Sequence, residues 1–131
     1  TITIPNSITS IGDSAFFGCE SLTSITIPEG VTNIGRDAFC GCSGLTSIIV
    51  AKGNEKYDSR ENCNAIIETE TNTLIRGCKN TIIPNSVTSI GWCAFNDCDS
   101  LTIYCEAESK PSGWDSVWNP DDRPVVWGYK G

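Results

Sequence analysis

The sequence predicts a β-rich solenoid, in which short parallel strands stack as successive coils of a right-handed superhelix. One stretch of the 131-residue chain occurs three times, at residues 4–28, 27–50 and 83–105. Pro5 and Pro28 are 23 residues apart, and Pro28 and Pro84 are 56 apart, which is one such unit plus a longer one of 33. A repeat of this length is one supersecondary unit that buries its apolar side only against its neighbours.

Each unit is expected to contain a short inner strand. In the first unit Leu22, Ile25 and Ile27 follow the spacing L-x-x-I-x-I, which places them inward and Thr26 outward. A briefer extended segment follows and ends at a glycine that marks a bend. An Ala-Phe pair comes next, in a segment so short that we expect a helical or 3-10 turn. The phenylalanines of these pairs should stack along the core: Phe16, Phe39 and Phe95.

The long unit, residues 51–83, is expected to carry an insertion. Its two apolar runs, Asn64 to Glu68 and Thr73 to Gly77, are separated by the polar stretch Thr69 to Asn72. Two strand-like runs joined by a short polar loop predict a β-hairpin. Insertions in a solenoid lie on the outer face, so we expect a convex β-hairpin, after which residues 81–83 resume the inner strand.

The C-terminal part has a different composition. Residues 1–105 are predicted to form the solenoid, and residues 106–131 an α/β cap, which contains three of the four tryptophans. Trp114 and Trp118 are one helical turn apart, and residues 124–128 resemble a final strand. Because the chain begins within a repeat unit, we expect it to be a piece of a longer solenoid. Its N-terminal edge could pair with a second copy.

Charge and composition argue against several classes of function. The net charge is −7 and only 19% of residues are charged, so no basic surface for nucleic acid is expected. No run of about 18 apolar residues occurs, so no insertion into a membrane is expected. Histidine, the commonest general base and metal ligand, is absent. We therefore expect no enzyme, no cofactor and no metal site.

The eight cysteines allow more than one interpretation. Cys19, Cys42 and Cys98 each lie three residues after a repeated phenylalanine, which favours a ladder of reduced, buried thiols. The alternatives are a disulfide framework or a metal site. Cys63 and Cys78 flank the expected hairpin and could form a bridge. The spacing C-x-C of Cys40 and Cys42 is too short for the usual zinc knuckle.

Acidic and aromatic groups also have two interpretations. Paired carboxylates could indicate glycoside hydrolysis or calcium binding, but the Asp residues lie at scattered positions of the repeat and fit solvated turns better. They are Asp97, Asp99, Asp115, Asp121 and Asp122. Trp114, Trp118 and Trp127 could form a carbohydrate-stacking platform, although their spacing favours a small core within the cap.

The favoured binding surface is the outward row of the inner strands. Aligning the units places one residue per coil in register: Thr3, Thr26, Ile49, Ile82 and Tyr104. Three apolar members side by side on an exposed parallel sheet are unusual unless a partner covers them. Scattered apolar side chains on a sheet are the alternative explanation. We take Thr26, Ile49, Ile82 and Tyr104 as candidate contacts on the concave face.

The repeated pattern N-S-V-T-S-I-G-x-x-A-F-x-x-C-x-x-L-T-S-I-x-I-P resembles the BspA-type leucine-rich repeat, a family of bacterial surface and secreted proteins. Residues 57–67 and Gly77-Cys78 resemble the long unit of that family, and Trp114, Trp118 and residues 125–128 its closing segment. The resemblance implies a leucine-rich-repeat fold, an extracellular or cell-surface location, and adhesion or binding of a protein such as a host extracellular protein. It supplies no catalytic residues.

The function expected from these observations is a non-catalytic protein-binding or cell-adhesion module. Two alternatives stay open. The chain could be a structural spacer or stalk that presents another domain, or a glycan-binding module that uses its tryptophans.

Overall fold

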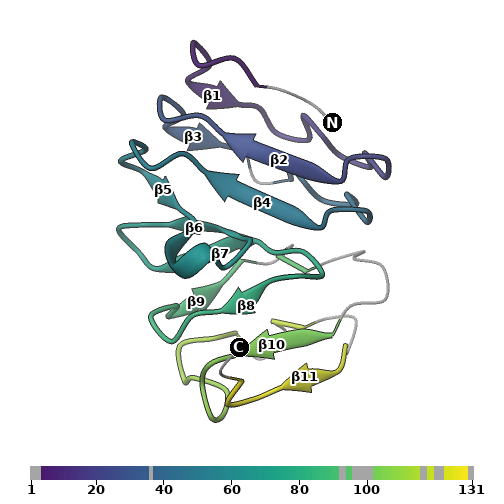
Figure 1. Cartoon of the computed structure of the whole chain (residues 1–131), viewed down its shortest axis with the longest axis vertical. Coiled ribbons are helices and arrows are strands. Elements are labelled where there is room, and N and C mark those ends of the chain that lie inside the picture. Colours follow the sequence, from purple (N-terminus) through teal and green to yellow (C-terminus); the bar gives the residue numbers. More distant parts are fainter. Residues whose placement is uncertain are drawn as a thin grey trace.

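The computed structural model describes residues 4–35, 37–91, 94–95, 102–115, 118–119 and 123–129. Figure 1 shows coils stacked along the long axis, with β1 (Ser10–Ile11) toward one end and β11 (Val125–Val126) toward the other. The elements along the described residues are short strands and one 3-10 turn, η1 (Arg60–Asn62). The predicted solenoid is confirmed.

The inner strands form two parallel sheets. One pairs β2 (Ser24–Ile27) with β4 (Ser47–Val50), and the other orders β8 (Ile82–Ile83), β10 (Ile103–Cys105) and β11 as β11-β10-β8. Side chains alternate along each strand, because successive Cβ atoms point to opposite faces. In β2, Ile25 and Ile27 are buried while Thr26 is exposed, as the spacing predicted.

A second set of strands lies on the other side of each coil. It pairs β1 with β3 (Asn33–Ile34) and forms a four-stranded sheet in the order β5-β6-β7-β9. Its strands are β5 (Tyr57–Asp58), β6 (Ile66–Glu68), β7 (Thr73–Arg76) and β9 (Ser89–Ile90). Strands β6 and β7 are the predicted antiparallel hairpin, and β7 pairs in parallel with β9 of the next coil. The insertion thus extends this second sheet, and β8 resumes the inner strand, as expected.

A row of threonines fixes the register between the first coils. Thr32 donates from its backbone N–H and its hydroxyl to the carbonyl of Thr9, at 2.9 and 3.3 Å. Thr46 does the same with Thr23, at 2.8 and 3.1 Å. Each pair is 23 residues apart, so a polar group that the coil would leave without a partner instead bonds its neighbour. These hydrogen bonds therefore join residues that are one repeat apart and hold neighbouring coils in register.

The predicted phenylalanine stack is wrong in one part. Phe16 and Phe39 stack with ring centroids 5.3 Å apart and planes within 5°. Phe95 instead belongs to a second cluster of buried residues, with Leu74 and Ile83. The long unit contains no Ala-Phe pair, and Arg76 and Gly77 lie in its place. The buried Arg76 donates to the carbonyl of Cys42 at 3.2 Å, and the ring of Phe95 packs against Gly77.

The tryptophans close the C-terminal end. Trp114 and Trp118 are 3% and 8% exposed, and their ring centroids are 4.9 Å apart. Trp127 lies 6.0 Å from each of them. Core packing of these rings, rather than an exposed platform, is confirmed, but a separate core within the cap is wrong, because Trp114 and Trp118 belong to the cluster that contains Phe95. The helix expected there is not present among residues 111–115 and 118–119, where turns occur. The final strand is β11, which pairs with β10.

Candidate binding face

The candidate site is formed by the residues of the inner strands whose side chains point away from the core. We call this surface the outer strand face; it does not include the sheet that contains the β6–β7 hairpin. It is built from side chains that alternate with the core residues of β2, β4, β8, β10 and β11. Two of the three large apolar residues exposed in the described chain lie here, Ile49 at 51% and Val126 at 39%. The third is Phe17, at 62%, in a turn of the first coil.

The predicted register holds in pairs. Thr26 lies opposite Ile49, and Ile82 lies opposite Tyr104. Thr3 lies outside the described residues. In each pair the neighbours within a strand, such as Ile48 and Val50 around Ile49, are buried in the core. The four candidate residues therefore do share one side of the inner strands.

The row is not continuous, however. Strand β4 does not pair with β8, because residues 59–65 of the long unit lie between them. The hydroxyl of Ser59 accepts from the N–H of Val50 at 2.9 Å and donates to the carbonyl of Ala65 at 2.7 Å. On the other side the N–H of Ile82 donates to the carbonyl of Cys63 at 3.2 Å. Polar backbone and side chains thus separate Ile49 from Ile82, and the expected line of three adjacent apolar residues is wrong.

This separating segment has an unusual backbone. Glu61, Asn62 and Asn64 have φ of 58°, 53° and 58°, in the left-handed region that non-glycine residues seldom adopt. Asn tolerates this region better than most residues, because its short side chain bonds locally. A pattern of apolar spacing cannot indicate such a segment, which explains why the sequence predicted an unbroken row.

The C-terminal part of the outer strand face contains two residues that the sequence analysis missed. Val126 lies opposite Tyr104 in the parallel pairing of β11 with β10, so it continues the row. Tyr129 packs its ring against that of Tyr104, with centroids 4.7 Å apart and planes tilted by 50°. Aligning residues 124–128 with the inner strands would have found Val126. The position of Tyr129 depends on the fold.

The thiols are buried, as the ladder predicted, but only in part. Cys42 is buried and its Sγ lies 3.1 Å from the carbonyl oxygen of Phe16, whereas Cys19 is half-buried. Cys98 lies outside the described residues. Cys63 and Cys78 are both free thiols, so the bridge considered between them is not formed. Burial raises the pKa of Cys63 and of Cys105 to about 12, which makes both thiols poor nucleophiles.

Cys40 differs from these thiols because it is disulfide-bonded. The sequence analysis kept a disulfide framework only as an alternative and singled out no bridge at Cys40. The spacing of Cys40 and Cys42 gave no signal for this bridge, since a disulfide joins residues that the fold, not the sequence, brings together.

Acidic groups form no recognisable site in the described chain. Among the residues that the structure describes, no group of three or more Cys, Asp or Glu is arranged to hold a metal ion. Asp115 is exposed in a turn, and the other four aspartates considered lie outside the described residues. None of the helices in the described part of the chain is long and apolar enough to span a membrane.

The geometry of stacked coils with a short strand in each agrees with a match to one family model. The model of the BspA type leucine rich repeat region matches in six copies, over residues 1–76 and 65–109. The chain belongs to the BspA-type leucine-rich repeat family. The outer strand face is therefore a surface of a BspA-type solenoid, and its interruption comes from one long repeat.

Solved structures show the same fold. A leucine rich cell surface protein from Faecalibacterium prausnitzii is 34% identical, with a TM-score of 0.62 over 77% of this chain. A leucine-rich repeat protein from Eubacterium ventriosum is 19% identical, with a TM-score of 0.61 over 79%. The pneumococcal vaccine antigen PcpA is 20% identical, with a TM-score of 0.62 over 75%.

These three alignments cover 28%, 31% and 25% of the respective solved chains, so this BspA-type chain spans less than a third of each. No curated protein matches the chain. The last two structures share only the fold with it. The first also shares enough sequence to make the chain a repeat module of the kind found in a bacterial surface protein.

Proposed function

We propose that the chain is a non-catalytic protein-binding or cell-adhesion module of a surface or secreted bacterial protein. We propose further that its outer strand face contacts the partner through Thr26, Ile49, Ile82 and Tyr104. The observation that carries the proposal is the 51% exposure of Ile49 at the centre of an ordered strand. An isoleucine that faces away from the core contributes little to folding, yet it provides apolar area to an interface.

Support for the location comes from the family and from the Faecalibacterium relative, which is described as a cell surface protein. Support for a binding role comes from the composition of the outer strand face. Its apolar residues are flanked by hydroxyl groups such as those of Ser24 and Ser47, which are half-buried at the starts of β2 and β4. Apolar centres with polar rims are typical of protein interfaces.

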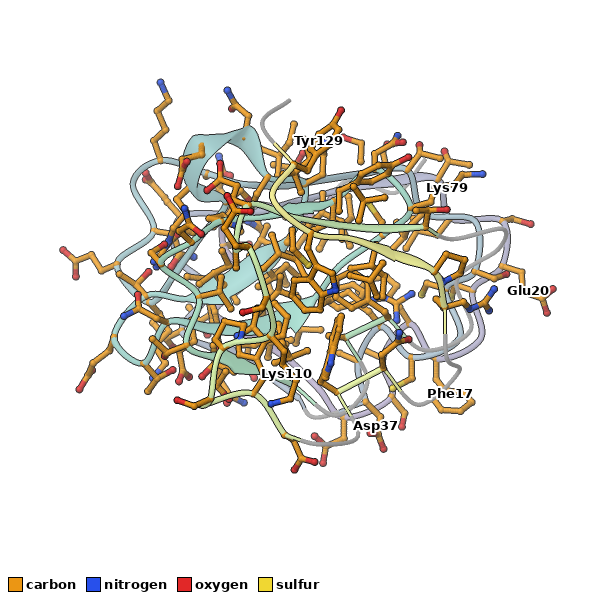
Figure 2. The ribbon with its side chains drawn as sticks, turned by 90° about the horizontal axis from the view of Figure 1, so that it is seen from below. Phe17, Glu20, Asp37, Lys79, Lys110 and Tyr129 are labelled. Carbon is orange, nitrogen blue, oxygen red and sulfur yellow. The ribbon has the colours of Figure 1, made fainter. Side chains whose placement is uncertain are left out.

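The test compares two matched variants in binding to immobilised host extracellular-matrix proteins. The double variant Ile49→Glu/Tyr104→Glu places two charges on the outer strand face. The control, Phe17→Glu, introduces one such charge at a side chain that is more exposed and lies on another side of the molecule, away from Tyr129 (Figure 2). We expect the double variant to lose binding by at least about tenfold, the effect of burying unpaired charge, and the control to bind normally.

Circular dichroism melting of both variants verifies that the fold is kept. Equal binding by the wild type and a folded double variant would refute the assignment of the outer strand face. Absence of binding by the wild type to every protein of the panel at micromolar concentration would instead favour the spacer role. The glycan alternative has less support than before, because Trp114 and Trp118 are buried and present no ring face to a sugar.

A further inference from the structure

Two of the three tyrosines in the chain form a pair on the outer strand face. The rings of Tyr104 and Tyr129 have centroids 4.7 Å apart and planes tilted by 50°. This separation lies at the short end of the range for packed aromatic rings, so the faces of the two rings overlap in part. Both side chains are only half-buried, and Figure 2 shows Tyr129 near the outer margin of the molecule. Solvent-borne reagents therefore reach the pair.

Backbone contacts hold both tyrosines in place. Tyr104 is the middle residue of β10, and because both of its neighbours in the strand are fully buried, its side chain points outward. The N–H of Tyr129 donates to the carbonyl of Cys105 at 2.8 Å, and the N–H of Gly128 donates to the carbonyl of Ala107 at 2.7 Å. The fold thus fixes each ring against the other. Reactive groups held in this way react with each other far faster than groups that meet by diffusion.

The third tyrosine has a different environment. Tyr57 lies in β5 of the second sheet and is 3% exposed. Its hydroxyl oxygen accepts a hydrogen bond from the N–H of Ile34 at 3.0 Å. It belongs to the buried cluster of the first coils, whereas β10 contributes to the other cluster. A reagent that attacks phenols from solvent therefore meets the paired tyrosines and not Tyr57.

We propose that Tyr104 and Tyr129 form an oxidative modification site, at which a haem peroxidase with hydrogen peroxide joins the two side chains as dityrosine. The peroxidase removes one electron and one proton from each phenol. The two phenoxyl radicals then form one C–C bond between the ring carbons next to the hydroxyl-bearing carbons, and the hydrogen on each of these carbons moves to the phenol oxygen. Two C–H bonds are replaced by one C–C bond, and one hydrogen peroxide is reduced to two water molecules.

The geometry of the pair suits this reaction. Phenoxyl radicals join through the faces of their rings, so partly overlapping rings are the productive approach. The product fastens the segment after β11 to β10 and closes a covalent loop between residues 104 and 129. Such a loop lowers the entropy of the unfolded chain, as a disulfide does. We therefore expect the cross-linked protein to melt at least about 5 °C higher than the untreated protein.

The test treats the full 131-residue chain with a haem peroxidase and hydrogen peroxide, then reduces and alkylates its cysteines. Cleavage after glutamate separates residues 71–106 from residues 109–131, and each of these peptides contains a single tyrosine. We expect mass spectrometry to find the two peptides joined with the loss of two hydrogens, together with dityrosine fluorescence. The product should run as a monomer on a denaturing gel, and the joined fraction should change less than about twofold on about tenfold dilution, because the reaction is intramolecular.

Two matched variants locate the reaction. Tyr129→Phe keeps the ring but lacks the phenol, so it should lose both the joined peptides and the fluorescence. Tyr57→Phe removes the buried phenol and should retain both signals. Circular dichroism melting of the treated proteins should show the higher Tm for the wild type and for Tyr57→Phe, but not for Tyr129→Phe.

Absence of the joined peptides from the folded wild type would overturn the inference, as would joining only between two chains or equal yields from Tyr129→Phe and Tyr57→Phe. An unchanged Tm of the cross-linked wild type would overturn the stabilising role of the cross-link. The reaction needs no protein partner, so this inference does not depend on the proposed binding function.

Discussion

Replacing Gly77 by alanine tests whether the long repeat really inserts its backbone against the core of the next coil. A Cβ built at Gly77 would collide with Cε1 of Phe95 and lie 2.7 Å from Cζ and 2.9 Å from Cδ1. Phe95 is 3% exposed, so its ring has little room to move away. Overfilling a packed core by one methyl group typically costs about 1–3 kcal/mol.

Gly12→Ala is the matched control. A Cβ at Gly12 has no atom within 4 Å, and its backbone is not in the left-handed region that would strain an alanine. The same substitution there should be neutral or stabilise by about 0.4–1 kcal/mol, because alanine lowers the entropy of the unfolded chain. The two variants differ only in what the new methyl group contacts.

Urea unfolding followed by circular dichroism measures both changes in the free energy of unfolding. In a thermal melt of a chain of this size, a change of 1 kcal/mol in the free energy of unfolding shifts Tm by about 3–5 °C, so the difference between the two variants is easily resolved. Combining Gly77→Ala with Phe95→Leu should give less destabilisation than the sum of the two single variants, because the smaller side chain makes room. Equal stability of Gly77→Ala and Gly12→Ala would refute the packing of Phe95 on Gly77.

Two further predictions concern titration and thiol reactivity. Burial alone would raise the pKa of Asp58, but hydrogen bonds from Arg60 and Thr69 outweigh it and hold that pKa below its usual value. A depressed carboxyl pKa stabilises the fold at pH values above the unfolded-state pKa, and this stabilisation is lost as pH falls through the folded-state pKa. Asp58→Asn should therefore lower the urea midpoint at pH 7 and flatten its fall between about pH 5 and pH 2; an unchanged pH profile would contradict this reasoning. With iodoacetamide at pH 8, mass spectrometry of the native protein should find half-buried Cys19 modified before buried Cys63 and Cys105, and equal rates would contradict the described burial.

Much of the architecture is decided locally, and the sequence therefore predicts it. The 23-residue spacing sets the length of a coil, and alternation around Ile25 and Ile48 decides which side chains face inward. The hairpin of β6 and β7 follows from two apolar runs and a polar loop. These features depend on neighbours along the chain or on the same position of the next repeat, and the amino-acid sequence gives both directly.

The candidate site depends on contacts that the repeat does not specify. Sequence alone placed Ile49 and Tyr104 outward, but the long unit separates them with a left-handed segment around Asn62, because 33 residues must cover the rise of one coil. Only the fold brings Tyr129 onto Tyr104, since a glycine in the left-handed region returns the chain to β10. Local periodicity thus determined the scaffold, whereas pairings between distant and non-repeating segments decided what its surface presents.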